Sequence, residues 1–432
     1  MSASTTARPP GDPGWLTGRL TRRLVAGSRG RTLLALGLLG LLALSVTRAV
    51  SGQDVLTDAG TAQALVALGL PIALAGLGGL VCERAGVVNI GLEGMMILGT
   101  WGAGWAGYQW GAGGALLGAL LGGMLGGLLH AVATVTFGVD HIVSGVAINL
   151  LAAGTVRFLS ELLYEGVRGG GPTQSPTVRG GAPTFDVPLL TTGPDLLGRL
   201  ADTRWVLLSD AAGLLRGLLA QVSVLELLGV AMFPLVAYVL WRTPVGLRLR
   251  SAGENPWAAE SLGVDVARVK YAAVLASGAL AGLGGLFLVL FSGLYKEGQT
   301  GGRGYIGLAA MIFGNWRPGG VLGGSVLFGY TDAIRLRSQT SLAVLSLFLL
   351  ASLLVLALGL WWLAHRRRVA GAVCLGLATA SFLGYARLDG LPNEVTTVAP
   401  YLVTLLVLAV SAQRLRPPQA DGLPYRPGEE PR

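Results

Sequence analysis

The sequence of 432 residues is too apolar and too poor in charge to belong to a water-soluble domain. Hydrophobic residues make up 52% of it and charged residues 13%, and it contains 68 glycines, whereas soluble domains carry roughly 25% charged residues and about 7% glycine. The formal net charge of +9 fits the cytoplasmic loops of a membrane protein better than nucleic-acid binding. Two cysteines, Cys82 and Cys374, exclude a disulfide scaffold and a thiolate metal cluster. We therefore expect an all-α polytopic membrane protein.

Apolar stretches follow one another from residue 31 onward, and a membrane span needs about 20 such residues. The stretch 304–334 is interrupted by Asn315–Gly320, which predicts a short helix pair or a re-entrant hairpin. With that pair we expect about twelve transmembrane helices, some of them broken. The stretches are 31–50, 61–82, 94–109, 112–137, 142–163, 223–241, 271–293, 304–334, 341–364, 369–386 and 397–413.

Basic residues predict the orientation in the membrane, because loops rich in Lys and Arg stay on the cytoplasmic side. Counting crossings places the basic N-terminal segment 1–30, the loop 242–270 and the cluster His365–Arg368 on the same side. The N- and C-termini are then cytoplasmic, and residues 165–222 form an extracytoplasmic loop. The Pro-rich residues 414–432 predict a disordered cytoplasmic tail.

An internal repeat is visible in the apolar stretches. Leu74–Leu80 recurs letter for letter as Leu280–Leu286, and Ile90–Met96 is echoed by Ile306–Ile312. Two matches in the same order favour duplication over chance. The copies fall in the second and seventh predicted spans, an odd offset, so they point opposite ways through the membrane. An inverted repeat of this kind is typical of transporters, with the pathway at the repeat interface.

The densest group of polar residues between apolar stretches is 83–94. An ionised side chain at membrane depth is costly unless it faces a cavity or a partner, and the glycines here permit a broken helix. A short cytoplasmic turn with solvated side chains explains Glu83 and Arg84 equally well. For Asn89 and Glu93, which are followed directly by two methionines, we favour a role in lining the pathway.

A second, weaker group comprises Asp140, His141 and Asn149. Asp140 fits a helix N-cap, and Asn149 fits a hydrogen bond between packed helices, at least as well as either fits a functional role.

The residues 248–263 predict a short helix on the basic side of the membrane. Asn255 precedes Pro256, which is favoured at the first helical position, and Gly263 falls near the end. Such a helix could dock Trp257 into a groove on another protein. A helix anchored in the bilayer interface by Trp257 explains the pattern equally well, and the residues alone leave both readings open.

Nothing in the sequence points to covalent chemistry. Neither lysine, Lys270 or Lys296, stands in a Gly-Lys-Ser/Thr phosphate-binding loop, and no HExxH, GxSxG or Cys/His metal spacing occurs. We therefore expect no catalytic residues, no metal and no cofactor.

Four motifs in order resemble the nucleoside permease subunits of bacterial ABC importers, within the wider branched-chain amino acid, ribose and nucleoside permease family. They are Gly76–Gly99, His141–Leu150, Gly246–Gly263 and Gly302–Ala310. The resemblance extends over 60–165, 223–335 and the last span with Pro400 and Tyr401. The family would pass quickly from Thr331–Gln339 to Pro400, so the stretches 341–364 and 369–386 are an addition.

The resemblance implies a permease domain at 31–413, including the extra helix pair 341–386, in a bacterial plasma (inner) membrane. It implies three partners: a second homologous permease in a heterodimer, an ABC ATPase that binds the ATP, and an extracytoplasmic substrate-binding lipoprotein. The implied substrate is a nucleoside. The alternatives are an ABC permease for a sugar or branched-chain amino acid, and an ion-coupled secondary transporter.

The resemblance also implies roles for individual residues. It favours docking over interfacial anchoring for the short helix and assigns coupling to the ATPase to Arg250, Gly253, Glu254, Asn255, Pro256, Trp257, Ala258 and Gly263. The residues expected along the substrate pathway are Asn89, Glu93, Met95, Met96, Ser144, Asn149 and Tyr305.

Overall fold

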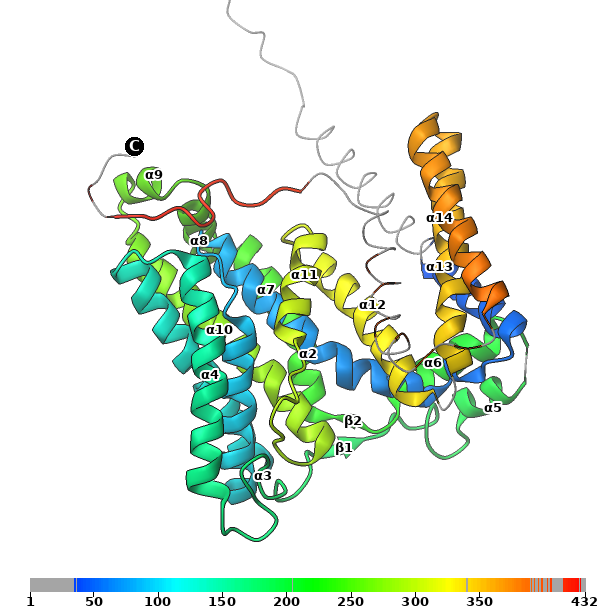
Figure 1. Cartoon of the computed structure of the whole chain (residues 1–432), viewed down its shortest axis with the longest axis horizontal. Helices are drawn as coiled ribbons and strands as arrows, with labels where there is room; N and C mark the ends of the chain where they lie inside the picture. Colours follow the sequence, from blue (N-terminus) through cyan, green and yellow to red (C-terminus); the bar gives the residue numbers. More distant parts are fainter. Residues whose placement is uncertain are drawn as a thin grey trace, which may run out of the picture.

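The computed structural model describes residues 37–203, 205–338, 341–388 and 415–426, together with the single residues 35, 390, 392, 395, 398, 402, 405 and 428. The segment 1–30 and most of the stretch 397–413, with Pro400 and Tyr401, lie outside the described residues. Within the described part, seven helices are long and apolar enough to cross a membrane. The chain is therefore a mostly helical, multi-pass membrane protein (Figure 1).

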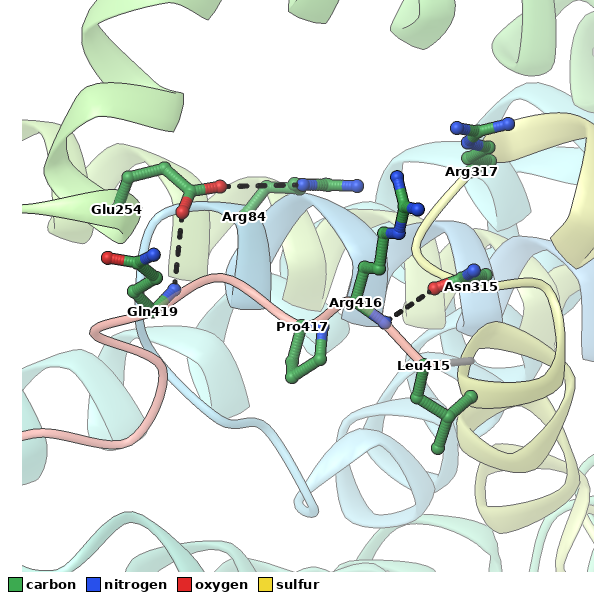
Figure 2. Close-up of a pocket in the computed structure, with 8 residues that line it drawn as sticks. All are labelled: Arg84, Glu254, Asn315, Arg317, Leu415, Arg416, Pro417 and Gln419. Carbon is green, nitrogen blue, oxygen red and sulfur yellow. Dashed lines mark hydrogen bonds and ion pairs between the residues drawn. The ribbon is translucent and has the colours of Figure 1, made fainter. Parts of the chain in front are cut away.

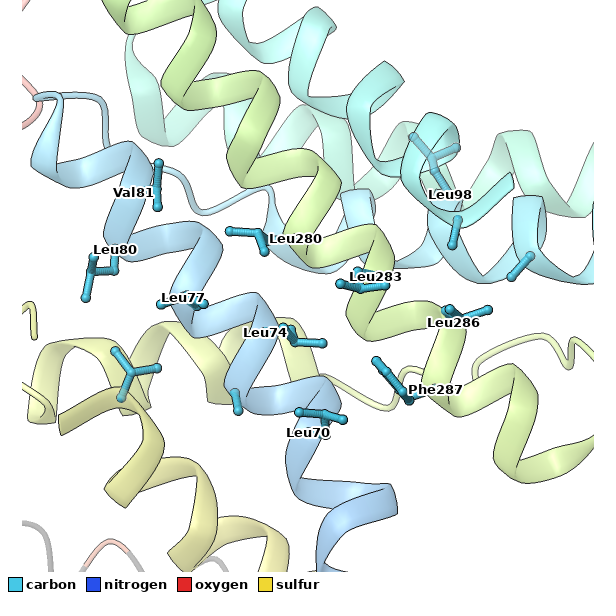
Figure 3. Packing of buried hydrophobic residues seen from close by; sticks show 14 of the residues in the cluster. Leu70, Leu74, Leu77, Leu80, Val81, Leu98, Leu280, Leu283, Leu286 and Phe287 are labelled. Carbon is cyan, nitrogen blue, oxygen red and sulfur yellow. The ribbon is translucent and has the colours of Figure 1, made fainter. Parts of the chain in front are cut away.

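Two antiparallel helices form the centre of the molecule. Helix α2 (Ala59–Arg84) begins at Asp58, whose carboxylate accepts a hydrogen bond from the Thr61 N–H, and helix α10 (Val266–Ser292) begins at Asp265 in the same way, with the Arg268 N–H as donor. They cross where each carries its copy of the repeated heptapeptide, and they run in opposite directions there (Figure 3).

Glycines of the heptapeptide permit this close crossing. A Cβ at Gly78 would lie 2.7 Å from the Ser277 carbonyl oxygen, and a Cβ at Gly284 would lie 2.8 Å from that of Pro71. Ser277 and Pro71 each stand three residues before their own copy, and Gly78 and Gly284 are equivalent positions. The two copies therefore meet through equivalent contacts.

Helix α3 (Leu92–Ala131) is a hairpin. Its backbone breaks at Gly111, where φ is +73°, a region that favours glycine. A Cβ on Gly102 or Gly118 would run into the other arm, so small residues let the two arms approach closely. The predicted stretches 94–109 and 112–137 are therefore the two arms of this hairpin, and the second arm continues into the π-helix η2 (Val132–Thr136). Helix α3 packs against α10.

Two irregular segments interrupt the helices around the central pair. Residues 85–91 join α2 to α3, and residues 293–302 lead into the short helix α11 (Arg303–Phe313). A turn at 314–317 then gives helix α12 (Pro318–Arg337), with Pro318 at its first position. The stretch 304–334 is thus a helix pair, as its polar interruption predicts.

The remaining elements surround this centre. Helix α4 (His141–Tyr164) flanks α3, and helices α13 (Ser341–Ala364) and α14 (Arg368–Arg387) pack on each other at the opposite side in Figure 1. Helices α7 (Val224–Arg242), α8 (Pro244–Glu254) and α9 (Pro256–Ser261) complete the described helical core. We call the end of the molecule that carries α8 and α9 the α9 end.

Residues 165–222 lie at the opposite end, which we call the β1 end, and they are partly regular. They contain the helices α5 (Leu196–Asp202) and α6 (Leu208–Leu219), and the strand β1 (Thr184–Phe185), which pairs antiparallel with β2 (Val222–Ser223). Asp210 of α6 accepts hydrogen bonds from Arg48 Nη1 at 2.6 Å and from Thr57 Oγ1 at 2.7 Å, close to the 3-10 turn η1 (Asp54–Leu56). These contacts attach the segment to the helices.

Candidate functional site

The irregular segment 85–91 is held by polar side chains from several helices. The buried Asn89 amide donates from Nδ2 to Ser277 Oγ of α10 at 2.9 Å and to Met95 Sδ at 3.3 Å. Its Oδ1 accepts from the Gly91 N–H at 3.0 Å. A buried amide group is stable only when its donors and acceptors are satisfied. Asn89 therefore bonds the irregular segment 85–91 to helix α10 of the central pair.

Two histidines satisfy the backbone of Val88 in the same segment. Its N–H donates to His141 Nδ1 at 3.2 Å, and its carbonyl oxygen lies 3.0 Å from His130 Nε2. Because Nε2 must carry the proton for that contact, His130 Nδ1 accepts from Ser144 Oγ at 2.9 Å. Ser144 thus helps to hold the irregular segment 85–91 through His130, a residue that the sequence patterns did not single out.

Glu93 joins the two irregular segments to each other. Its Oε1 accepts from the Gly302 N–H at 3.0 Å and its Oε2 from the Gly304 N–H at 2.7 Å, at the first turn of α11. A carboxylate is favoured there because the first N–H groups of a helix have no partner within it. The backbones approach so closely that a Cβ on Gly304 would lie 2.5 Å from Glu93 Cα.

Asn149 of α4 completes this cluster. Its Oδ1 accepts from the Gly94 N–H at 2.7 Å, and its Nδ2 donates to the Ile90 carbonyl at 3.0 Å and to Tyr305 Oη at 2.9 Å. The hydrogen bond between packed helices that the sequence suggests for Asn149 is therefore present, and so is the Asp140 N-cap of α4.

The structure thus brings six of the seven expected pathway residues into one cluster, while the seventh, Met96, packs against Ala75 and Leu288. Tyr305 is 46% exposed, while the other six are buried. The side-chain amides and the carboxylate in the cluster are occupied by partners within the chain. Across the described ranges, no group of His, Cys, Asp or Glu could hold a metal ion. The cluster orients backbone. Its pairing of a hydroxyl with an imidazole, Ser144 with His130, is buried and holds Val88 in place, so the described residues form a structural junction at which the phenol of Tyr305 is exposed.

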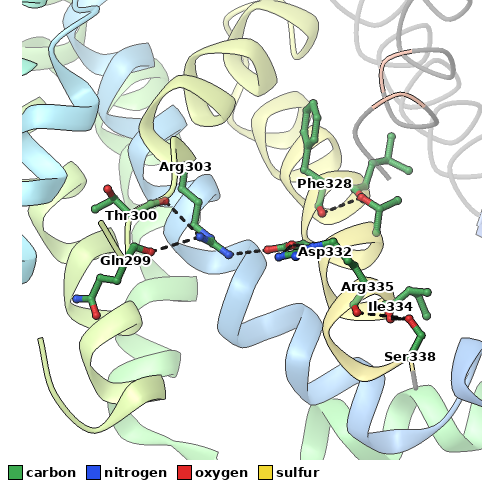
Figure 4. Close-up of polar contacts among 10 residues, drawn as sticks. Gln299, Thr300, Arg303, Phe328, Asp332, Ile334, Arg335 and Ser338 are labelled. Carbon is green, nitrogen blue, oxygen red and sulfur yellow. Dashed lines mark hydrogen bonds and ion pairs between the residues drawn. The ribbon is translucent and has the colours of Figure 1, made fainter. Parts of the chain in front are cut away.

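A second polar cluster lies beside the central pair, toward the β1 end (Figure 4). Asp332 of α12 is buried and accepts from Arg303 Nη2 at 2.6 Å and from Arg335 Nε at 3.0 Å. The cluster borders a cavity of about 180 Å³. Sequence reasoning missed Asp332 and Arg335, although an acid within the apolar stretch 304–334 is a signal of this kind.

The helix at 256–261 forms as the sequence predicts. Asn255 Oδ1 accepts from the Ala258 N–H at 3.0 Å, Pro256 occupies the first position, and Gly263 follows with φ of +82°. Trp257 is half-buried, whereas Leu262 is 85% exposed. The exposed apolar side chain of this segment is therefore Leu262, which sequence reasoning did not single out.

Other expected coupling residues hold α8 in place. Arg250 Nε donates to the Leu240 carbonyl at 2.9 Å, and a Cβ on Gly253 would collide with the Arg84 carbonyl oxygen. Glu254 Oε1 lies 3.9 Å from Arg84 Nη1. Arg84 itself donates from Nη2 to the Trp316 carbonyl at 2.8 Å, so α8 is linked to the turn between α11 and α12.

Residues 415–426 of the tail expected to be disordered have a defined course across the α9 end. The Arg416 N–H donates to Asn315 Oδ1 at 2.8 Å, the Gln419 N–H to Glu254 Oε2 at 3.3 Å, and the Ala420 N–H to the Gly253 carbonyl at 2.9 Å. The structure differs from the expectation because these backbone groups find partners distant in sequence. Arg84 and residues of this segment border a cavity of about 620 Å³ (Figure 2).

The end of this segment covers Trp257. The rings of Tyr425 and Trp257 lie 6.2 Å apart edge to face, and Lys270 Nζ lies 5.5 Å from the Tyr425 ring. Burial raises the pKa of Asp421 to about 7, although a hydrogen bond with the Glu83 side chain and the charges of Lys270 and Arg84 act to lower it. Burial likewise raises the pKa of Tyr425 to about 12. The tail and the α8–α9 segment therefore share one packed surface.

Comparison with known proteins gives consistent matches. Residues 61–358 match the family described as branched-chain amino acid transport system / permease component. The guanosine ABC transporter permease protein NupQ of Bacillus subtilis is 31% identical, over 83% of this chain and 94% of its own length. The nucleoside ABC transporter permease protein NupC of Lactococcus lactis is 33% identical, over 82% and 93%. The putative glucose ABC transporter permease protein TsgC13 of Haloferax volcanii is 34% identical, over 65% and 78%. No solved structure matches the chain.

Proposed function

We propose a function from one premise: the chain belongs to the branched-chain amino acid transport system / permease component family. It is accordingly a membrane-embedded ABC transport subunit and not an enzyme, and ATP is hydrolysed by a partner ATPase. One observation carries this conclusion: two relatives named ABC transporter permeases match this chain over most of its length. The lack of a phosphate-binding loop in the sequence agrees with it.

The substrate that we propose is a nucleoside. Two relatives that span more than four fifths of the chain are named for guanosine and for nucleosides, while the one named for glucose covers 65% of it. A sugar or a branched-chain amino acid is the alternative.

Uptake competition tests the substrate. Cells that lack the gene are complemented with it and supplied with a labelled nucleoside, and unlabelled purine and pyrimidine nucleosides, glucose and leucine are added as competitors. We expect nucleosides alone to compete. Gene-dependent uptake of labelled glucose or leucine without uptake of the nucleoside would assign the alternative. Uptake by the isolated chain down an ion gradient without ATP would contradict an ABC mechanism.

The architecture that we propose has about twelve crossings, cytoplasmic termini and an inverted repeat, in a bacterial plasma membrane. The antiparallel crossing of the two heptapeptide copies supports the inverted repeat. Its parts are a cytoplasmic segment 1–30, a permease domain 31–413 and a cytoplasmic tail 414–432. Within the domain lie the extracytoplasmic loop 165–222, the cytoplasmic coupling loop 242–270 and the extra helix pair 341–386.

In this proposal the cluster around Glu93 serves the substrate pathway. Tyr305 lines the path, since it is exposed at the point where two irregular segments meet. Asn89, Glu93 and Asn149 set the positions of the two helix starts, and Met95, Met96 and Ser144 lie behind them. Transporters of inverted-repeat architecture build their pathways from such discontinuous helices.

The partners are a second homologous permease, an ABC ATPase and an extracytoplasmic binding lipoprotein. Coupling to the ATPase uses the segment 250–263, and the exposure of Leu262 at its end supports docking through this residue. A docking surface needs an apolar anchor that enters a pocket of the partner. Trp257 supports this docking surface from the interior side, where its ring packs against that of Tyr425.

The substitution Leu262→Asp tests this surface. We expect the tagged variant, purified from its host membranes, to lose the ATPase subunit in the eluate, because a charge would be buried in an apolar contact. Leu196→Asp is the matched control, since Leu196 is exposed at the first turn of α5 at the β1 end, where an acid is favoured. Equal ATPase recovery with both variants would contradict docking through Leu262.

A further inference from the structure

The cavity of about 620 Å³ at the α9 end is lined by four separate parts of the chain. They are the last residue of α2, the last residue of α8, the turn between α11 and α12, and tail residues between 415 and 419. Apart from Glu254, this lining is separate from the residues of the proposed substrate pathway and coupling surface. The cavity therefore calls for an explanation of its own.

Positive charge dominates the lining of this cavity. Arg84, Arg317 and Arg416 line it together with a single carboxylate among its described lining residues, that of Glu254. In Figure 2 the guanidinium group of Arg416 rises from the tail segment between those of Arg84 and Arg317. Like charges that share a site repel one another, and an anion placed between them removes this repulsion.

The carboxylate does not neutralise these arginines, because it is already engaged. Glu254 Oε2 accepts from the Gln419 N–H at 3.3 Å, and its Oε1 lies 3.9 Å from Arg84 Nη1. Arg84 also donates from Nε and Nη2 to the Trp316 carbonyl oxygen, at 3.2 and 2.8 Å. Arg84 is thus held in a fixed position at the wall of the cavity.

The other two guanidinium groups are open to a ligand. The side chains of Arg317 and Arg416 are exposed, and neither has a hydrogen-bond or ion-pair partner among the residues that the structure describes. Arg317 is also the N-cap residue of α12, and its side chain offers no acceptor to the first N–H groups of that helix. The positive end of the helix dipole therefore adds to the charge of the arginines.

We propose that this cavity binds a phosphate group. Three guanidinium groups and one carboxylate leave two positive charges unbalanced, and a phosphate group carries about one to two negative charges at neutral pH. A planar guanidinium group binds phosphate through two parallel hydrogen bonds. The volume leaves room for the molecule that carries the phosphate, which is either a phospholipid, bound through its headgroup, or a soluble phosphate.

A bound phosphate joins parts of the chain that are far apart in sequence. Arg84 ends α2, Arg317 precedes α12, and Arg416 belongs to the tail. Binding therefore stabilises the course of residues 415–426 across the α9 end, since a ligand favours the state to which it binds. This site does not depend on which substrate the chain transports.

Thermal unfolding of the detergent-solubilised full-length chain measures the binding. Sodium phosphate replaces sodium chloride at constant pH and ionic strength, and the rise of the unfolding midpoint with phosphate concentration gives an apparent Kd. A second series exchanges phosphatidylcholine for the anionic phosphatidylglycerol in mixed micelles. Because phosphate also stabilises proteins that have no site for it, the comparison between variants carries the test.

The double substitution Arg317→Gln and Arg416→Gln removes the two exposed guanidinium groups and breaks no described side-chain contact. We expect the apparent Kd for phosphate to rise at least about tenfold, because charge-assisted hydrogen bonds are lost. Arg242→Gln with Arg248→Gln is the matched control. These two arginines are also exposed at the α9 end and lie outside the lining, so the control removes the same charge and should bind as the wild type does.

Each probe has its own outcome. A loss confined to the double variant of Arg317 and Arg416, seen with phosphatidylglycerol and not with phosphate, assigns a lipid headgroup to the site, and the same loss with phosphate assigns a soluble ligand. Equal shifts in the wild type, the double variant and the control, or no shift with either probe, overturn the site, because phosphate then acts only as a stabilising salt.

Discussion

Glu93, in the first turn of α3 directly after the irregular segment 85–91, binds the start of α11 at the end of the irregular segment 293–302. Its two oxygens accept from the Gly302 and Gly304 N–H groups, and the side chain is 6% exposed, so water cannot replace it. Leaving a buried donor without a partner costs more than the hydrogen bond itself contributes. The start of α11 therefore depends on this carboxylate.

Replacing Glu93 by Ala should lower the free energy of unfolding by about 2–4 kcal/mol, because two buried N–H groups lose their acceptor. Glu93→Gln keeps one acceptor oxygen and should lose about 1 kcal/mol. The measurement is thermal unfolding of the detergent-solubilised protein. Glu161→Ala is the control, since Glu161 pairs with Arg157 on the surface of α4 and exposed pairs contribute little. Equal losses for Glu93→Ala and Glu161→Ala would contradict this role.

Asp421 is expected to make the docking of the tail depend on pH. Burial in the docked tail raises its pKa to about 7 from its ordinary value of 3.8. Between these two values the docked tail holds a proton that a free tail releases, so docking weakens as the pH rises through about 7. Docking is strongest on the acidic side of this window.

Asp421→Asn should remove this dependence, since an amide does not titrate. Docking can be followed by the quenching of a bimane label at Leu423→Cys by Trp257, and the native cysteines are both buried and leave little background. We expect the quenching to fall between about pH 4 and pH 7 with Asp421, the range between its free and docked pKa values, and to stay constant with Asn. A fall of the same size in Asp421→Asn would assign the titration to another group.

At the scale of elements, helix contacts through glycine hold the core together. The arm of α3 after Gly111 packs on α10 so closely that a Cβ on Gly123 would run into the Gly278 carbonyl oxygen. In lipid, where burial of apolar surface does not drive helix association, such close backbone packing is a main source of stability.

Gly123→Ala should therefore destabilise the protein by about 1–3 kcal/mol, the usual cost of overpacking. Gly154→Ala is the same substitution at a helical position with nothing within 4 Å of the added Cβ. It should be neutral or stabilising by up to about 1 kcal/mol, since alanine favours the helix. Thermal unfolding in detergent separates the two, and similar effects would argue against the glycine contact.

Sequence patterns predicted the elements whose signals are local. The short helix that starts at Pro256 and the interrupted helix pair before Arg337 are confirmed, and the cap reading of Asp140 holds, because each depends on neighbours a few residues away. The course of residues 415–426 was not predictable, since it depends on partners such as Gly253 that are far away in the chain. Trp257 is partly buried because Tyr425 of this tail segment packs against it. Its burial was not predictable either, since the contact joins residues far apart in the chain.

At the scale of the whole molecule, the two ends carry different surfaces. The α9 end combines α8, α9 and the tail segment, while the β1 end carries α5, α6 and the short sheet (Figure 1). An ATP-driven importer needs its coupling surface in the cytoplasm, where ATP is, and its substrate entry on the other side. The proposed function therefore requires that these two ends face opposite compartments.

Single cysteines test this requirement, because Cys82 and Cys374 are buried and react poorly. Ser261 at the α9 end and Thr203 at the β1 end are both exposed. A membrane-impermeant maleimide should label Thr203→Cys but not Ser261→Cys in intact cells, and the pattern should reverse in inside-out vesicles. Labelling of both residues from the same side would place the coupling segment and residues 165–222 in one compartment, which no permease driven by a cytoplasmic ATPase could tolerate.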